Sequence, residues 1–445
     1  MMKCNRFEWI SRIMPCLFLI PAIFASFSAI AQAADQEALL LHAARVFDGD
    51  SMRTNTSMLL VNGQVAQIGP RESFKSSNAK VIDLGDATLL PGFIELHAHL
   101  SFQKVPADIV LRHGITTIRD VGGPLHKPYG GDGSLRVLTS GPILTAPGGY
   151  PIPMLGDDAN IAVAVSTEKE ARATVRDLVN RGAVVIKIAL EPGGEAGAPW
   201  SSGHEHGHSH GSGHGHGSGQ GQGDHHAQPD ASHGHTHHKP AQGASPSKQA
   251  WPLLPENIVK AIVDEAHRNN RKVTAHIAEE RGAQIAVNAG VDEWAHMPCD
   301  VVPESLLKKA AAQNVKIVGT LDTLSKCVGV ARNAKVWTAL GGELLYGAEI
   351  AHPDIPWGID AQELMYMMQM GKIGLIDVLR TATSKAGRQL DLPLLGTLQQ
   401  GAPADIIAVR GDPAHNLKIL EHPDLVISGG KIVANHFKDR PPVSP

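Results

Sequence analysis

Eight short apolar runs alternate with helical patterns between Leu90 and Glu349, and this alternation constrains the fold more than any other feature. Such a pattern is typical of a parallel sheet built from strand–helix units. Eight units predict an α/β architecture closed into a (β/α)₈ TIM barrel, with a domain over residues 90–390. We expect the strands at Thr88–His97, Ile115–Asp120, Arg136–Leu144, Val184–Leu190, Val273–Ile277, Glu293–Met297, Lys316–Leu321 and Glu343–Glu349.

Two helices are marked clearly by their ends. Thr167 and Glu170 form a capping box, and Gly182 can end the helix that they begin. A second helix begins at Pro255-Glu256 and runs to Asn270. Each helix leads directly into a predicted strand, as a strand–helix repeat requires.

The two ends of the chain have a different pattern, with short β-like runs separated by turns. Short β-like runs occur between Ala38 and Val81, where Asn62-Gly63 marks a tight turn, and again between Gly396 and Val433. We expect residues 34–89 and 391–445 to meet in one small β-domain. Its predicted strands are Ala38–Val46, Ser57–Val61, Gln64–Ile68, Ala404–Val409, Leu425–Ile427 and Lys431–Val433.

The first 33 residues are predicted to be an export signal. Three basic residues precede an apolar run over Ile13–Ile30, and the small residues Ala31 and Ala33 mark a cleavage site. An uncleaved membrane anchor is the alternative, because a run of about 18 residues can just span a bilayer. Pro15, Pro21 and the cleavage site favour removal of the signal. We therefore expect a periplasmic or secreted protein without stable membrane insertion.

Charge and cysteine content exclude some partners and leave one question open. The 40 Lys and Arg residues against 44 Asp and Glu give a net charge of −4, which offers no electrostatic reason to bind nucleic acid. Removal of the signal leaves Cys299 and Cys327, which do not have the C-x-x-C spacing of a thiolate zinc site. A disulfide between them and a pair of free thiols both remain open.

A segment over residues 193–249 consists mainly of Gly, Ser, His and Gln, and we predict that it is a disordered insertion. It begins six residues after Lys187, at the strand end where a barrel keeps its functional loops. Its imidazoles predict several zinc sites, for which nickel, copper or cobalt could compete. A low-complexity repeat without a role is the alternative. The histidines are His204, His206, His208, His210, His214, His216, His225, His226, His233, His235, His237 and His238.

Five residues that suit metal chemistry fall at the C-terminal ends of predicted strands. His97 and His99 lie on one face of the first strand, because residues i and i+2 of a strand point to the same side. Lys187 lies inside an apolar run, where an unpaired ammonium is costly. His276 ends the fifth strand and His296 the sixth. Barrels concentrate catalysis at these ends, so the set predicts a metal-dependent active site.

With these motifs the chain resembles the metal-dependent amidohydrolase superfamily, in the branch similar to imidazolonepropionases and prolidase-like dipeptidases. The resemblance covers nearly the whole chain after the signal, and it implies that the small β-domain is a composite β-sandwich made from both termini. It is carried by Lys187 and by the segments Leu90–Leu100, Gly114–Gly123, Thr274–Ala278, Gly290–Met297 and Gly396–Ile407.

The resemblance implies a binuclear centre, with zinc or another divalent metal at both positions. His97 and His99 would bind one metal ion, and His276 and His296 the second. Lys187 would bridge the two ions as a carbamate. Addition of CO₂ agrees with the position of Lys187, because it converts a buried cation into an anionic bridge. The expected partners are a small-molecule substrate and divalent metal ions, and no feature of the sequence fixes an oligomeric state.

The chain departs from the family pattern at the eighth strand. Members usually carry Gly-Thr-Asp there, and the Asp binds metal and accepts a proton, whereas this chain reads Gly347-Ala348-Glu349. Glu349 keeps the carboxylate in register, and we predict that it is both ligand and catalytic base. Its extra methylene matters, because a misplacement of about 1 Å can cost on the order of 100-fold in rate. Asp354 and Asp360 are the alternatives.

Two further positions are expected at the mouth of the pocket: Tyr150 and His352 could contact substrate. Arg119 and Asp120 are expected to form a structural ion pair at the end of the second strand.

Two functions follow from the sequence. The first is an exported binuclear amidohydrolase that cleaves an amide bond, in a dipeptide or a cyclic amide, while the histidine-rich loop captures zinc for the site. The alternative is a catalytically impaired barrel that acts as a periplasmic zinc buffer or metallochaperone.

Overall fold

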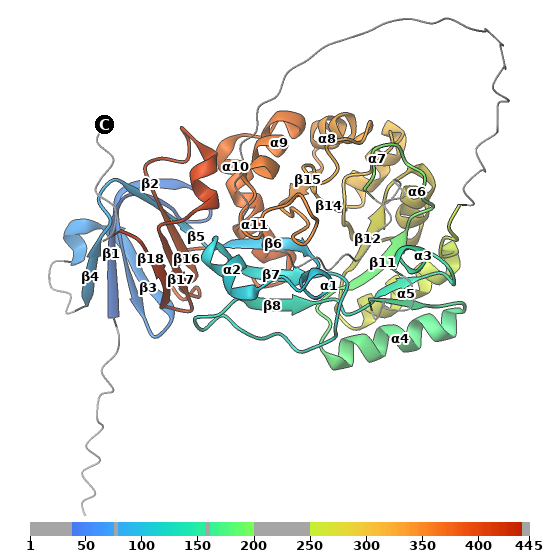
Figure 1. The fold of residues 1–445 in the computed structure, drawn as a ribbon, viewed down its shortest axis with the longest axis horizontal. Coiled ribbons are helices and arrows are strands. Elements are labelled where there is room, and N and C mark those ends of the chain that lie inside the picture. The colour runs from blue at the N-terminus through green and yellow to red at the C-terminus, as the bar shows by residue number, and fades with distance from the viewer. Residues whose placement is uncertain (1–37, 75–78, 156–160, 200–249, 438–445) are drawn as a thin grey trace, which may run out of the picture. The chain divides into compact units, whose positions relative to one another are not determined.

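The computed structural model describes residues 38–74, 79–155, 161–199 and 250–437, which belong to one compact unit (Figure 1). The predicted signal and all twelve histidines of the insertion lie outside these ranges. Within the described part of the chain, no helix has both the length and the apolar character needed to cross a membrane.

Strands from both ends of the chain form one sheet in the order β18-β17-β16-β5-β1-β2-β3, and β4 also pairs with β1. The two ends meet where β5 pairs antiparallel with β16, with Leu90 opposite Ile407. The strands are β1 (Ala38–Phe47), β2 (Met52–Val61), β3 (Gln64–Pro70), β4 (Lys80–Asp83), β5 (Ala87–Pro91), β16 (Ile406–Arg410), β17 (Leu425–Ser428) and β18 (Lys431–Asn435).

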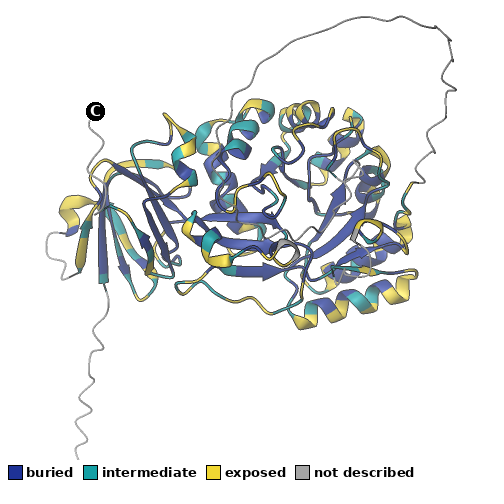
Figure 2. Ribbon diagram, in the orientation of Figure 1, coloured by how far each residue is buried: buried dark blue, intermediate teal, exposed yellow. Residues whose placement is uncertain are grey.

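Both ends of the chain contribute to this sheet, and its edge strand β3 also contacts the segment before β16. An isolated bridge between Gln64 and Pro403 and a bond from Val65 N to Ala402 O (2.9 Å) tie β3 to the segment before β16. Buried stretches run along its strands (Figure 2), and its hydrophobic core includes Leu41 and Met58. The expected turn between β2 and β3 is present: Asn62 has φ +52° and Gly63 φ +76°, as a two-residue hairpin turn requires.

The remaining strands form two parallel sheets, one in the order β6-β7-β8 and one in the order β10-β9-β11-β12-β13-β14-β15. They are β6 (Phe93–Ala98), β7 (Ile115–Asp120), β8 (Arg136–Thr139), β9 (Ile143–Thr145), β10 (Ala162–Ala164), β11 (Ile186–Leu190), β12 (Val273–Ile277), β13 (Glu293–Trp294), β14 (Lys316–Val318) and β15 (Glu343–Leu345).

The two parallel sheets do not join into the one continuous closed sheet that was predicted. Between the edges of β6 and β15 the described residues record one parallel bridge, Ala98 with Ile350, and a bond from His99 N to Ile350 O (3.0 Å). The Ala348 N–H donates to the Glu95 carboxylate (3.0 Å) and not to a backbone carbonyl of a neighbouring strand. The fold is therefore a barrel-like α/β arrangement with an additional β-sheet.

Several strands differ from their predicted limits for local reasons. The predicted strand Thr88–His97 is divided at Gly92, where the chain passes from β5 in the terminal sheet to β6 in a parallel sheet. Only glycine fits at this point, because a Cβ would lie 2.2 Å from the Thr116 side chain. The predicted strands through Leu321 and Glu349 end early. β14 ends at Val318 and β15 at Leu345, and the left-handed backbones of Thr320 (φ +46°) and Glu349 (φ +68°) exclude these two residues from a strand.

The two predicted helices are present as α4 (Glu168–Arg181) and α5 (Glu256–Arg268). Thr167 Oγ1 accepts the Glu170 N–H (3.2 Å), and the helix ends at Gly182. The other helices are α1 (Leu100–Gln103), α2 (Ala107–Arg112), α3 (Ile152–Leu155), α6 (Glu280–Ala289), α7 (Glu304–Ala312), α8 (Val330–Ala339), α9 (Ala361–Gly371), α10 (Leu375–Thr381) and α11 (Ser384–Gln389), with 3₁₀ turns at Arg71–Phe74 and Leu417–Glu421.

The open question about the cysteines is answered by a disulfide between Cys299 and Cys327, whose Cα atoms are 4.9 Å apart. It joins the loop after β13 to the segment after β14. Both loops lie at the strand ends that carry the histidines described next.

Candidate metal centre

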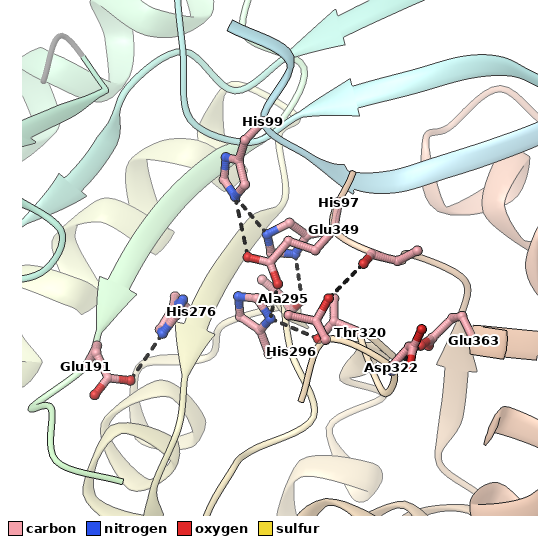
Figure 3. A network of polar contacts seen from close by, with 12 residues as sticks. His97, His99, Glu191, His276, Ala295, His296, Thr320, Asp322, Glu349 and Glu363 are labelled. Atoms are coloured by element: carbon pink, nitrogen blue, oxygen red, sulfur yellow. Dashed lines mark hydrogen bonds and ion pairs between the residues drawn. The ribbon is translucent and has the colours of Figure 1, made fainter. Parts of the chain in front are cut away.

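The predicted metal-binding residues converge at the C-terminal ends of the parallel strands (Figure 3). His97 lies on β6, His276 on β12, and His296 follows β13. His97, His296 and Glu349 each offer one ligand atom, and these atoms all lie within 4.8 Å of one another. Residues far apart in the sequence therefore present nitrogen and oxygen donors to one point.

His97 and His99 face each other through the nitrogens that a metal would use. His97 Nδ1 donates to the Ala295 carbonyl (2.7 Å), so the lone pair of the ring is on Nε2. Nε2 of His99 lies 3.2 Å from Nε2 of His97 and 3.9 Å from Glu349 Oε1. A cation held between these atoms would satisfy both rings.

Burial keeps the four histidines in the form that binds metal. It lowers the pKa of His99 to about 3 and brings the pKa values of His97, His276 and His296 well below their ordinary value. The positive charge of Lys187 lowers all four pKa values further. Neutral imidazole is the ligand form, so the site is prepared for a metal ion without releasing protons from these rings.

Lys187 is a buried lysine whose surroundings also indicate that the site binds a further group. It is only 1% exposed, and its Nζ has no hydrogen-bond partner among the described residues. Burial lowers the pKa of Lys187 to about 7, although the Glu349 carboxylate opposes the shift. An amine with this pKa is partly neutral near pH 7, which is the form that can react with CO₂.

Glu349 occupies the position predicted for it. Burial raises its pKa to about 7 against the opposing charge of Lys187, and its Oε2 lies 3.9 Å from His296 Nδ1 without a hydrogen bond in the described structure. The alternatives are placed elsewhere: Asp354 is exposed, and Asp360 caps α9 by accepting the Gln362 N–H (2.9 Å). The unpaired Lys187 and Glu349 atoms beside neutral imidazoles fit a divalent metal centre.

Sequence reasoning missed the acid that supports this arrangement. Glu95 is fully buried, and its carboxylate accepts the backbone N–H groups of His97 (2.7 Å) and Ala348 (3.0 Å). Burial raises the pKa of Glu95 to about 8, and these two backbone hydrogen bonds oppose the shift. An acid among the apolar residues Phe93, Ile94 and Leu96 of a fully buried strand was the available signal.

His276 differs from the other histidines in its partner. Its Nε2 lies 3.1 Å from Oε2 of Glu191, a buried residue that sequence reasoning also missed. The His276 ring remains 4.5 Å from the His296 ring, measured between centroids, so it belongs to the same cluster.

The two expected substrate contacts both lie beside this cluster. The Tyr150 ring is 4.6 Å from the His276 ring and stacks on Trp251 at 5.6 Å. His352 donates its backbone N–H to the Glu349 carbonyl (2.9 Å).

The expected ion pair between Arg119 and Asp120 is wrong. Arg119 binds Glu293 (2.5 Å), with both side chains buried, and donates to the Leu96 carbonyl (2.8 Å), while Asp120 accepts from the Ser101 hydroxyl (3.3 Å). Consecutive residues of a strand point to opposite faces, so these two side chains cannot meet.

Comparisons with known proteins identify proteins that are similar to this chain. A family model described as "Amidohydrolase family" matches residues 234–433. Ochratoxinase of Aspergillus niger is 27% identical over 197 residues, which cover 40% of this chain and 41% of that protein, so the match spans about two fifths of this curated relative.

Solved structures show the same fold over a longer span. The crystal structure of A. niger ochratoxinase gives a TM-score of 0.66 at 18% identity, covering 90% of this chain and 96% of that one. A Xaa-Pro dipeptidase crystallised with methionine in its active site gives 0.65 at 20% identity, covering 89% and 99%.

Proposed function

We propose that this chain, which is similar to metal-dependent amidohydrolases, is an exported hydrolase that cleaves an amide bond in a small molecule. The observation that carries the proposal is the convergence of His97, His296 and Glu349 around a buried lysine without a hydrogen-bond partner in the described structure. Ochratoxinase and the Xaa-Pro dipeptidase are similar proteins, and we infer a dipeptide or a cyclic amide as the substrate class.

Each residue of the cluster then has a role in holding metal. His97 and His99 would hold one divalent ion, and His276 and His296 a second, with Lys187 between them as a carbamate. We take zinc as the metal, since neutral imidazole and carboxylate donors suit it. When bound, such a pair of ions would make a water molecule acidic and polarise the substrate carbonyl.

Glu349 is the proposed base. Its pKa of about 7 lets it accept a proton from the attacking water near neutral pH and then donate that proton to the leaving nitrogen. Its carboxylate lies within 4 Å of His99 and His296, so the proton would move at the atoms that border the metal positions. Tyr150 and His352 would line the substrate side.

The histidine-rich segment would capture zinc for this centre. Its two described ends meet, because the Trp251 N–H donates to the Pro192 carbonyl (2.8 Å), and Trp251 stacks on the tyrosine that lies against His276. This supports a loop that leaves and re-enters beside the cluster. Because Ala348-Glu349 replaces the usual pair of residues, a zinc buffer on an impaired barrel is the second candidate.

A turnover screen with a matched base variant tests the proposal. The zinc-loaded protein should hydrolyse at least one member of a panel of dipeptides, N-acyl amino acids, cyclic amides and lactones, and Glu349→Gln should lose that activity while still binding zinc. If the loaded protein hydrolyses no member but Glu349→Asp does, the impaired-barrel candidate replaces the hydrolase.

A further inference from the structure

We propose that Glu191 is a positioning residue that fixes the tautomer of His276 and thereby selects Nδ1 as the nitrogen presented to the second metal position. That a metal ion binds there rests on the proposed function, whereas the contact between Glu191 and His276 is a feature of the structure itself.

The contact between the two side chains determines the tautomer. Glu191 Oε2 lies 3.1 Å from His276 Nε2, and the two side chains are 0% and 3% exposed. A carboxylate accepts, so Nε2 carries the hydrogen and the lone pair is on Nδ1. His97 has the opposite arrangement, because its Nδ1 donates to Ala295 and its lone pair is on Nε2, which faces His99. The two halves of the centre would therefore use different ring nitrogens.

The carboxylate is itself held in place. Its second oxygen, Oε1, accepts the Gly193 N–H at 2.5 Å, so Glu191 is oriented from both sides. Gly193 has φ +79°, and a Cβ there would lie 3.1 Å from the Trp251 ring, so only glycine fits this turn without strain. The turn that directs Glu191 toward His276 thus depends on close packing against Trp251.

A closed ring of contacts connects this turn to the far side of the imidazole. Trp251 bonds the Pro192 carbonyl and stacks on Tyr150, and Tyr150 lies against His276. The imidazole is therefore held by Glu191 at its Nε2 edge and by Tyr150 beside its ring. A histidine held by an outer carboxylate is a recognised way to orient a metal ligand, and loss of the partner typically costs about 10–100-fold in metal affinity.

The first readout of the test needs neither metal nor substrate. In metal-free protein labelled with ¹⁵N-histidine, and with the signal assigned by His276→Gln, His276 should show a single Nε2–H tautomer. Glu191→Ala should give a mixture of tautomers, whereas Glu191→Gln should keep the Nε2–H form through its amide oxygen. The exposed His267, which is bonded to Asp292, is an internal control that should not change.

The second readout is zinc affinity in a competition titration. Glu191→Ala should weaken the second zinc by about 10–100-fold and leave the first nearly unchanged. Glu195→Gln is the matched control, because it removes another buried acid of the same loop whose charge also reaches His276. It should leave the tautomer and the second zinc as they are.

Three results would overturn the inference: an Nδ1–H tautomer in the parent protein, an unchanged tautomer in Glu191→Ala, or equal effects of Glu191→Ala and Glu195→Gln. A parent protein that hydrolyses nothing but gives the expected tautomers and zinc affinities would refute the proposed hydrolase and support the role of Glu191.

Discussion

Glu349 combines an unusual side chain with an unusual backbone. It stands where the amidohydrolases that the sequence resembles usually carry the shorter aspartate, and it adopts φ +68°, a left-handed conformation that costs on the order of 1–3 kcal/mol for a residue other than glycine. The backbone is held by Glu95, which binds the N–H of the preceding residue. The longer side chain and the left-handed turn would then compensate each other, so that the carboxylate still reaches the histidines.

This compensation predicts the effect of restoring the shorter acid. Glu349→Asp should lower kcat by about 10–100-fold with little change in KM, because the carboxylate withdraws by about one methylene from the geometry that the turn provides. Steady-state kinetics on the best substrate of the panel measure this effect. A rise in kcat would show instead that Glu349 is a misplaced base.

At the scale of the elements, the edges of β6 and β15 are joined largely through a side chain. Glu95 accepts one N–H from its own strand and one from the segment that follows β15, and both are buried. A buried N–H without an acceptor costs about 1–3 kcal/mol. Glu95 therefore connects strand pairing to the position of Glu349.

Removal of this acceptor should destabilise the protein. Glu95→Ala should lower the free energy of unfolding by about 2–5 kcal/mol, since two buried donors lose their partner. Glu95→Gln, which keeps one amide oxygen, should lose clearly less. Urea denaturation of the metal-free proteins measures both, and equal stability of Glu95→Ala and the parent would contradict the role assigned to this carboxylate.

A second acid at the start of β15 predicts a pH dependence. Burial tends to raise the pKa of Glu343, but Lys316 (2.8 Å) and Lys385 (3.1 Å) lower it overall. A carboxyl whose folded pKa is lowered stabilises the protein above its unfolded pKa of about 4.3, and this contribution is lost as pH falls through the folded value.

Glu343→Gln should therefore be less stable than the parent at pH 7, by about 1 kcal/mol or less because the ion pairs are partly exposed. The difference should shrink as the pH falls below about 4.3 and should disappear once the pH is below the lowered pKa of the folded state. Denaturant unfolding of both proteins across this range measures it, and a difference that grows on acidification would contradict the sign.

Local sequence signals predicted some elements residue by residue and failed at others for physical reasons. β7 and β12 have their predicted limits, since each is a short fully buried strand rich in β-branched residues, and each follows a helix end in the sequence. The strands expected to reach Leu321 and Glu349 end earlier, at Val318 and Leu345. The left-handed backbones at Thr320 and Glu349 could not be predicted, because neither residue is a glycine that would indicate them. Glu95 and Glu191 were missed since their importance depends on partners distant in sequence.

At the scale of the whole molecule, the order of strand–helix units was sufficient to predict the meeting of distant residues. The ends of parallel strands share one face, so the spacing of the histidines and Lys187 indicated a common site. The connection between the two parallel sheets could not be predicted from the order of the units. It depends on one side-chain bond and one isolated bridge between the edges of β6 and β15.

The central claim is a metal centre at the C-terminal ends of the parallel strands, separate from the histidine-rich loop. Metal stoichiometry tests this claim most directly. Elemental mass spectrometry after exhaustive dialysis should be applied to the chain without residues 1–33, to the same chain lacking 203–238, and to that deletion with His97→Ala and His99→Ala. The account predicts about two metal ions per chain in the deletion and their loss with the two histidines. A deletion that holds no metal, even after incubation with excess zinc, would contradict it.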